Sequence, residues 1–150
     1  MGLDIPIRHL PYFLPKPAEK NGLRPEQKRS RPYFLFVGRL EYIKGVHNLI
    51  EVFKKKPEYD LLIAGDGAYR ENLEAQAKEC PNIEFLGRLS QAGLAEVYRS
   101  ALAVIVPSIC YETFGIIIIE AFSHKTPVIV NDLGALPEVV EDSDGRFVYR

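Results

Sequence analysis

Metal-ligating residues are too few in this sequence to suggest a metal site. The chain has two cysteines, Cys80 and Cys110, whose spacing is not that of zinc ligands, and no histidine cluster accompanies them. The same two thiols belong to no disulfide framework, which favours a reducing compartment. We therefore expect a cytoplasmic protein without a metal site.

Excess charge and long apolar runs are also missing. The net charge of −1 gives no general attraction to nucleic acid or to an anionic membrane. No apolar run approaches the roughly 18 residues of a membrane span, and the N-terminus lacks the apolar core of a signal peptide. The content of 47% apolar and 26% charged residues is ordinary for a soluble globular protein. We expect a soluble domain with no transmembrane segment and no nucleic-acid partner.

Prolines separate the first part of the chain from the rest. Six of the 11 prolines fall within residues 1–32, around a polar and basic stretch at 19–31. Proline removes a backbone donor and interrupts regular helix. We expect residues 1–31 to form an extended lead-in and linker, and residues 32–150 to fold as one domain.

Beyond residue 32, short apolar strands alternate with amphipathic helices. Strands are expected at 33–37, 60–64, 83–86, 101–106, 127–130 and 147–149. Helices are expected at 46–55, at 69–79, after Ser90, after Gly115 and at 137–141. Most of these strands are uniformly apolar, which is typical of a parallel sheet covered on both faces. The sequence therefore predicts an α/β protein, a Rossmann-like three-layer sandwich with a mainly parallel sheet.

The stretch Ile116–Ile119 allows two interpretations. Four consecutive isoleucines fit a buried strand, and they equally fit the first turn of a helix that begins near Gly115. A helix there would leave backbone N–H groups free to bind an anion such as a phosphate. Glu112 and Glu120 flank this unit, and their carboxylates would suit sugar or ribose hydroxyls. The alternative is that Glu112 is an ordinary loop residue and Glu120 an ordinary surface residue.

Two cations follow the first strand. Arg39 and Lys44 are expected at the carboxyl edge of the sheet, where ligands of such sheets bind. A guanidinium fork and an ammonium suit a pyrophosphate, although each cation is also consistent with a solvated surface charge. The turn 65–67 (Gly-Asp-Gly) lacks the third glycine of a dinucleotide fingerprint, and a tight turn explains it.

Taken together, these motifs resemble the C-terminal, donor-binding domain of retaining glycosyltransferases of the GT-B fold. That large family includes sucrose synthases, glycogen synthases and bacterial mannosyltransferases. The resemblance covers about residues 32–150. It rests on an ordered series of motifs: Gly38-Arg39 with Lys44-Gly45, Ala64-Gly65-Asp66-Gly67, Phe85-Leu86-Gly87, Pro107-Ser108, Glu112-Thr113-Phe114-Gly115, Glu120, Pro127-Val128-Ile129 and Leu133-Gly134-Ala135-Leu136-Pro137-Glu138.

The resemblance implies a hexosyltransferase that takes sugar from a UDP- or GDP-sugar and needs no metal or other cofactor. Arg39 and Lys44 would hold the diphosphate and stabilise it as it leaves, and Glu112 would contact the donor sugar, so these three are the implied catalytic residues. The other implied substrate-binding residues are Gly38 beside the cations, Leu86, Gly87 and Arg88 around the base, Phe114, Gly115 and Ile116 as backbone donors, and Glu120 at the ribose.

Two features depart from the family pattern. Lys125 stands where many relatives have glycine. The acceptor site of such enzymes belongs mostly to a preceding domain, which we expect to be missing here, so these 150 residues would bind a nucleotide-sugar weakly and transfer nothing. Peripheral membrane association of the longer enzyme is left open.

Two other function classes fit the same fold. One is a sugar-nucleotide epimerase, which is not expected to carry both the Arg39–Lys44 pair and the Glu112–Glu120 pair. The other is a non-catalytic nucleotide-binding module. A regulator of that kind would show an acidic cluster at the first strand ends, and a dinucleotide-binding domain would show a full three-glycine fingerprint.

Overall fold

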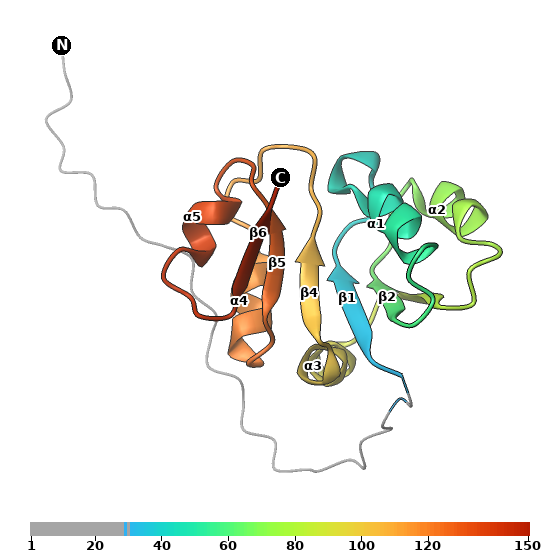
Figure 1. The fold of residues 1–150 in the computed structure, drawn as a ribbon, viewed down its shortest axis with the longest axis horizontal. Helices are drawn as coiled ribbons and strands as arrows, with labels where there is room; N and C mark the ends of the chain where they lie inside the picture. The colour runs from blue at the N-terminus through green and yellow to red at the C-terminus, as the bar shows by residue number, and fades with distance from the viewer. Residues whose placement is uncertain (1–28, 30) are drawn as a thin grey trace, which may run out of the picture.

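Six parallel strands form one sheet in a computed structural model that describes residue 29 and residues 31–150 (Figure 1). Their spatial order is β3-β2-β1-β4-β5-β6. The strands are β1 (Tyr33–Val37), β2 (Asp60–Ala64), β3 (Ile83–Gly87), β4 (Ala103–Val106), β5 (Val128–Asn131) and β6 (Arg146–Tyr149). The predicted linker, residues 1–31, lies outside the described residues except for Arg29 and Arg31.

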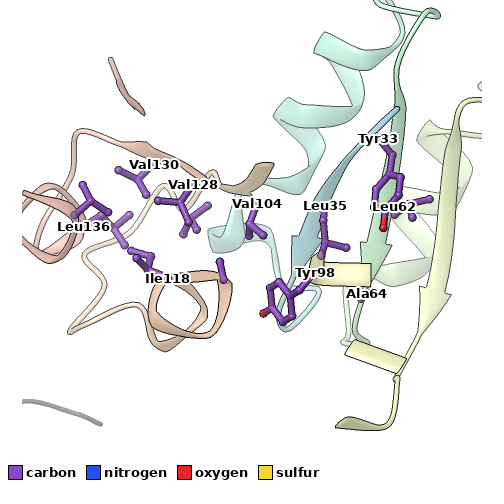
Figure 2. Packing of buried hydrophobic residues seen from close by; sticks show 13 residues of the cluster. Tyr33, Leu35, Leu62, Ala64, Tyr98, Val104, Ile118, Val128, Val130 and Leu136 are labelled. Carbon is purple, nitrogen blue, oxygen red and sulfur yellow. The ribbon is translucent and has the colours of Figure 1, made fainter. Parts of the chain in front are cut away.

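Helices cover both faces of the sheet. The helical elements are η1 (Tyr42–Lys44, a 3-10 turn), α1 (Val46–Phe53), α2 (Arg70–Gln76), α3 (Gln91–Ser100), α4 (Ile116–Ser123) and α5 (Leu136–Val140). One buried cluster joins the sheet to α1 and α2. Another, shown in Figure 2, joins it to α3, α4 and α5. This is the three-layer, Rossmann-like α/β arrangement that the apolar strands predicted.

The strand order reverses between β1 and β4. β1 pairs with β4 through Phe34 and Ala103 and through Leu35 and Val104, and β2 and β5 flank this pair on its two sides. The chain therefore leaves β1 toward α1 on one face and leaves β4 toward α4 on the other. A crevice opens at such a reversal, which is where open parallel sheets bind ligands.

The isoleucine run forms the first turn of helix α4. Ile118 is fully buried, whereas Ile116 is 43% exposed. The run therefore packs one side of a helix against the core, whereas a buried strand would be covered on both faces. The helical interpretation is confirmed and the strand alternative is wrong.

Other element boundaries differ from the sequence prediction by a few residues. β4 begins at Ala103, and α1 and α2 end at Phe53 and Gln76, all inside the predicted ranges. The short helix η1 was not predicted, because three residues are too few to show a periodicity.

Lys125 adopts the left-handed backbone conformation just after α4. Its φ is 61°, and it is the one non-glycine residue with a positive φ among the described residues. Its N–H donates to the carbonyl of Phe122, and the N–H of His124 donates to Ala121, as expected at a helix C-terminus. A lysine in this conformation costs roughly 1–2 kcal/mol, which glycine avoids.

We expect Lys125→Gly to raise the free energy of unfolding by about 0.5–1 kcal/mol, after subtracting the greater flexibility of glycine in the unfolded chain. Urea denaturation measures this change. Lys125→Ala is the matched control, because it removes the same charge and keeps the strained conformation. Equal stability of the two variants would contradict the strain argument.

Candidate functional site

An open cleft of about 270 Å³ lies at the reversal point between β1 and β4. It is bounded by the ends of both strands, the loops that follow them and the first turn of α4. Its lining residues are Phe36, Val37, Gly38, Arg39, Lys44, Ile105, Val106, Ser108, Glu112, Thr113, Phe114, Gly115, Ile116 and Ile117. The structure thus brings together seven of the sequence-predicted site residues: Gly38, Arg39, Lys44, Glu112, Phe114, Gly115 and Ile116.

Backbone contacts hold the two loops of the cleft together. The N–H of Ile109, after β4, donates to the carbonyl of Ile43 at 2.9 Å. Gly45 has a φ of 72°, and a Cβ there would lie 2.1 Å from the carbonyl oxygen of Pro107. Only glycine allows this close approach, which places Lys44 directly beside the β4–α4 loop.

The Gly65-Asp66-Gly67 turn supports the cleft from behind and does not line it. A Cβ on Gly65 would lie 1.9 Å from the carbonyl oxygen of Gly38, and the N–H of Leu40 donates to the carbonyl of Asp66 at 3.0 Å. A Cβ on Gly67 would lie 2.4 Å from the carbonyl oxygen of Leu40. Both glycines are therefore required for close packing against the loop after β1. This explains the motif without any contact to a phosphate.

Lys44 and Glu112 form a half-buried ion pair inside the cleft. Lys44 Nζ donates to Glu112 Oε1 at 2.5 Å, and both side chains are 18% exposed. Ser108 Oγ donates to the same carboxylate oxygen at 2.6 Å. Asn131, at the end of β5, fixes this loop by donating to the carbonyl of Ser108 at 3.0 Å.

The surroundings of Glu112 keep its carboxyl group ionised. Burial acts to raise its pKa, but the hydrogen bonds from Lys44 and Ser108, together with the Lys44 charge, outweigh burial and hold the pKa below its usual value. At neutral pH the side chain is therefore an acceptor-only carboxylate. One oxygen already has two donors, so the other is the one available to a ligand hydroxyl.

Arg39 lies at the mouth of the cleft. Its guanidinium donates to Glu41 at 2.7 Å, and its side chain is 72% exposed. An exposed ion pair of this kind contributes about 0–1 kcal/mol to stability. The guanidinium can therefore exchange Glu41 for a ligand anion at little cost in free energy.

The N-terminus of α4 faces the same cleft. Gly115 is the N-cap residue, with a φ of 77°, and it has no side chain with which to cap the first turn. The first backbone N–H groups of a helix have no partner within the helix, and its dipole places partial positive charge there. With Lys44 and Arg39, this end of α4 forms a site suited to an anion.

Four predicted site residues lie outside the lining of the cleft. Leu86 packs partly against the core, Gly87 ends β3, and Arg88 is exposed with Asp66 as its ion-pair partner at 3.8 Å. Glu120 accepts a hydrogen bond from the hydroxyl of Tyr98. The base and ribose contacts assigned to these residues remain predictions.

Sequence reasoning assigned no role to Ser108 or Asn131. Ser108 follows β4 and Asn131 is the last residue of β5, so both are polar residues at the carboxyl edge of the sheet, and that position was the available signal. Their hydrogen bonds join residues that are 4 and 23 positions apart, which no local periodicity reveals.

The family model of glycosyl transferases group 1 matches residues 19–150. The chain belongs to this family. An uncharacterised glycosyltransferase of Methanocaldococcus jannaschii is 38% identical over 122 residues, which is 77% of this chain and 31% of that protein. Glycogen synthase of Mycobacterium tuberculosis is 36% identical over 113 residues, which is 71% of this chain and 27% of that protein.

Solved glycosyltransferases of the GT-B fold share this architecture. Sucrose-phosphate synthase of Thermosynechococcus elongatus superposes with a TM-score of 0.72 at 31% identity, covering 79% of this chain and 32% of that one. The C-terminal domain of a group 1 glycosyltransferase of Francisella tularensis gives a TM-score of 0.67 at 26% identity, covering 79% of this chain and 67% of that one. Anabaena HepE, solved with UDP and glucose, superposes with a TM-score of 0.70 at 25% identity, covering 79% of this chain and 34% of that one.

The chain spans about a third or less of curated relatives that it matches, for example 31%, 23%, 27% and 32% of four of them. Within residues 29 and 31–150, no helix has both the length and the apolar character needed to cross a bilayer. The same residues contain no group of three or more His, Cys, Asp and Glu side chains able to hold a metal ion.

Proposed function

We propose that this chain is the donor-binding domain of a retaining glycosyltransferase, which moves a sugar from a nucleotide-sugar to an acceptor hydroxyl. The observation that carries the proposal is the Lys44–Glu112 pair, held beside the N-terminus of α4 in the cleft between β1 and β4. This arrangement sets a cation and helix N–H groups next to a carboxylate. A sugar diphosphate needs the same three elements, because its phosphates are anionic and its sugar presents hydroxyls.

The diphosphate would bind between Arg39, Lys44 and the first turn of α4. Charge develops on the leaving phosphate as the glycosidic bond breaks, and fixed positive groups stabilise that charge. Lys44 would exchange Glu112 for a phosphate oxygen when the donor binds. Glu112, released from Lys44 and still hydrogen-bonded to Ser108, would then accept hydrogen bonds from the donor sugar.

The nucleoside would lie along the ends of β3 and α4. Leu86, Gly87 and Arg88 would frame the base, and Glu120 would accept from the ribose hydroxyls. The complex of Anabaena HepE with UDP and glucose supports a UDP-sugar as the donor class. Arg39, Lys44 and the end of α4 supply the positive charge, and we propose that no metal is required.

The acceptor would bind to another part of a longer protein. This chain corresponds to 31% of the Methanocaldococcus jannaschii glycosyltransferase, and the cleft that the described residues form is open. We propose that an N-terminal domain supplies the acceptor side, and that the longer protein acts in the cytoplasm. Positioning an acceptor against the donor is worth about 7–11 kcal/mol of barrier, so the isolated domain should transfer sugar negligibly.

A melting-shift experiment tests the proposed ligand class. UDP and GDP are expected to raise the melting temperature of this chain more than free nucleosides do, and NAD is expected to leave it unchanged. The shift should diminish with added salt, because the exposed phosphates and cations are screened. Stabilisation by NAD, without any shift from nucleoside diphosphates, would favour a dinucleotide-binding module and contradict the proposal. Rapid interconversion of a nucleotide-sugar by the chain would favour an epimerase.

A further inference from the structure

A buried tyrosine on α3 reaches the glutamate predicted to contact the ribose. Tyr98 is 1% exposed, and its hydroxyl donates to Glu120 Oε2 at 2.9 Å. Figure 2 shows Tyr98 in the same buried cluster as Ile118, which belongs to α4 as Glu120 does. The hydrogen bond therefore joins α3 to the middle of α4, across the face of the sheet that both helices cover.

The position of Tyr98 is fixed from several sides. Its carbonyl accepts a hydrogen bond of 2.7 Å from the buried hydroxyl of Thr126, and its ring stacks on His124 with centroids 5.4 Å apart. Thr126 and His124 both follow α4 in the chain. The tyrosine hydroxyl is consequently held at a constant place relative to Glu120.

Loss of the hydrogen bond between Tyr98 and Glu120 would leave a buried hydroxyl without a partner. While the bond is present, it occupies only one of the two carboxylate oxygens of Glu120. A buried hydroxyl needs a partner, and the Glu120 carboxylate provides it. Burial, followed by the negative charge of Glu120 and the hydrogen bond to it, raises the pKa of Tyr98 well above its usual value, so the hydroxyl remains a donor at neutral pH. Glu120 Oε1 retains its lone pairs for a ligand.

We propose that Tyr98 is a positioning residue, which holds the Glu120 carboxylate in the orientation that accepts hydrogen bonds from the ribose hydroxyls of the donor. This inference rests on the proposed function, because it assumes that a nucleotide binds along α4. Tyr98 is buried and does not touch the ligand itself. Its effect on binding should therefore depend on the ribose hydroxyls alone.

The test compares UDP with 2′,3′-dideoxy-UDP by calorimetry, or GDP with its dideoxy analogue if the melting shifts favour GDP. The wild-type chain is expected to bind the ribose form more tightly. Tyr98→Phe should weaken binding of the ribose form by about threefold to tenfold and leave the dideoxy form unchanged. Comparing two ligands on one preparation removes any effect of a partly folded sample.

Tyr33→Phe is the matched control. Tyr33 is also a buried tyrosine of the same cluster, 4% exposed, and its hydroxyl donates to the carbonyl of Val97 at 2.8 Å rather than to Glu120. The Tyr33→Phe variant loses a hydroxyl oxygen, as Tyr98→Phe does, and is expected to bind both ligands as the wild type does. In a Glu120→Ala background, Tyr98→Phe should have no further effect on either ligand.

The outcomes separate the two proposals. Equal weakening of both ligands by Tyr98→Phe, or an undiminished preference for the ribose form, would overturn the positioning role. Absence of any nucleoside diphosphate binding by the wild type would instead overturn the proposed function.

Discussion

Lys44→Ala is expected to weaken binding of UDP or GDP by about 1.5–3 kcal/mol, which is roughly tenfold to 150-fold in the dissociation constant. Lys44 is half-buried in the cleft, beside the N-terminus of α4, so its charge is less screened than that of an exposed lysine. Its removal also leaves the negative charge of the Glu112 carboxylate uncompensated near the bound phosphates. Calorimetric titration measures the loss.

Two controls isolate the phosphate contact. Lys54→Ala removes the same charge at the far end of α1, where Lys54 pairs with Glu51, and should leave binding unchanged. A nucleoside without phosphate should bind the Lys44→Ala variant and the wild type equally. Arg39→Ala should likewise weaken the binding of nucleoside diphosphates and leave the binding of a nucleoside unchanged. An equal loss for nucleoside and nucleoside diphosphate would contradict the phosphate role of these cations.

Glu112→Gln is expected to reduce sugar transfer by roughly 10²–10³-fold in the longer glycosyltransferase proposed above. Glutamine keeps the size of the side chain and loses the charge that accepts hydrogen bonds from the donor sugar. Binding of the nucleoside diphosphate alone should not weaken. The structure indicates that it strengthens, because Lys44 loses the ion-pair partner that competes with phosphate. Turnover assays and calorimetry on the same variant measure the two effects.

Glu41→Gln is the matched control for this variant. Glu41 also pairs with a cation of the cleft, Arg39, but from the exposed rim, so its neutralisation should change turnover little. Glu120→Gln should weaken nucleoside diphosphate binding through the ribose. If Glu112→Gln weakens that binding as much as Glu120→Gln does, the division of roles between the two glutamates is wrong.

The fold was largely predictable from local patterns. Uniformly apolar strands such as Ala103–Val106 indicated a parallel sheet, and the apolar positions of Val46–Phe53 indicated a helix with one buried face. The isoleucine run was ambiguous locally, because β-branched residues favour strands. It forms a helix because Gly115 starts α4 in a left-handed conformation and Ile118 and Ala121 pack into the core.

The candidate site was predictable in position but not in its pairings. Glycines and cations after successive strands placed Arg39 and Lys44 at the carboxyl edge of the sheet. The sequence did not reveal that Lys44 pairs with Glu112, 68 residues away, or that Tyr98 donates to Glu120. Such contacts depend on how two loops or two helices meet in space, which periodicity does not encode. The close approach of Gly45 to Pro107 likewise depends on how two loops distant in the sequence meet in space.

A crystal structure of this chain with bound UDP or GDP tests the central claim most directly. We expect phosphate oxygens within hydrogen-bonding distance of Lys44 Nζ and of the backbone N–H groups at the start of α4, with the pair between Lys44 and Glu112 open. A nucleotide bound elsewhere, or phosphates that point to solvent while Lys44 remains paired with Glu112, would contradict the account.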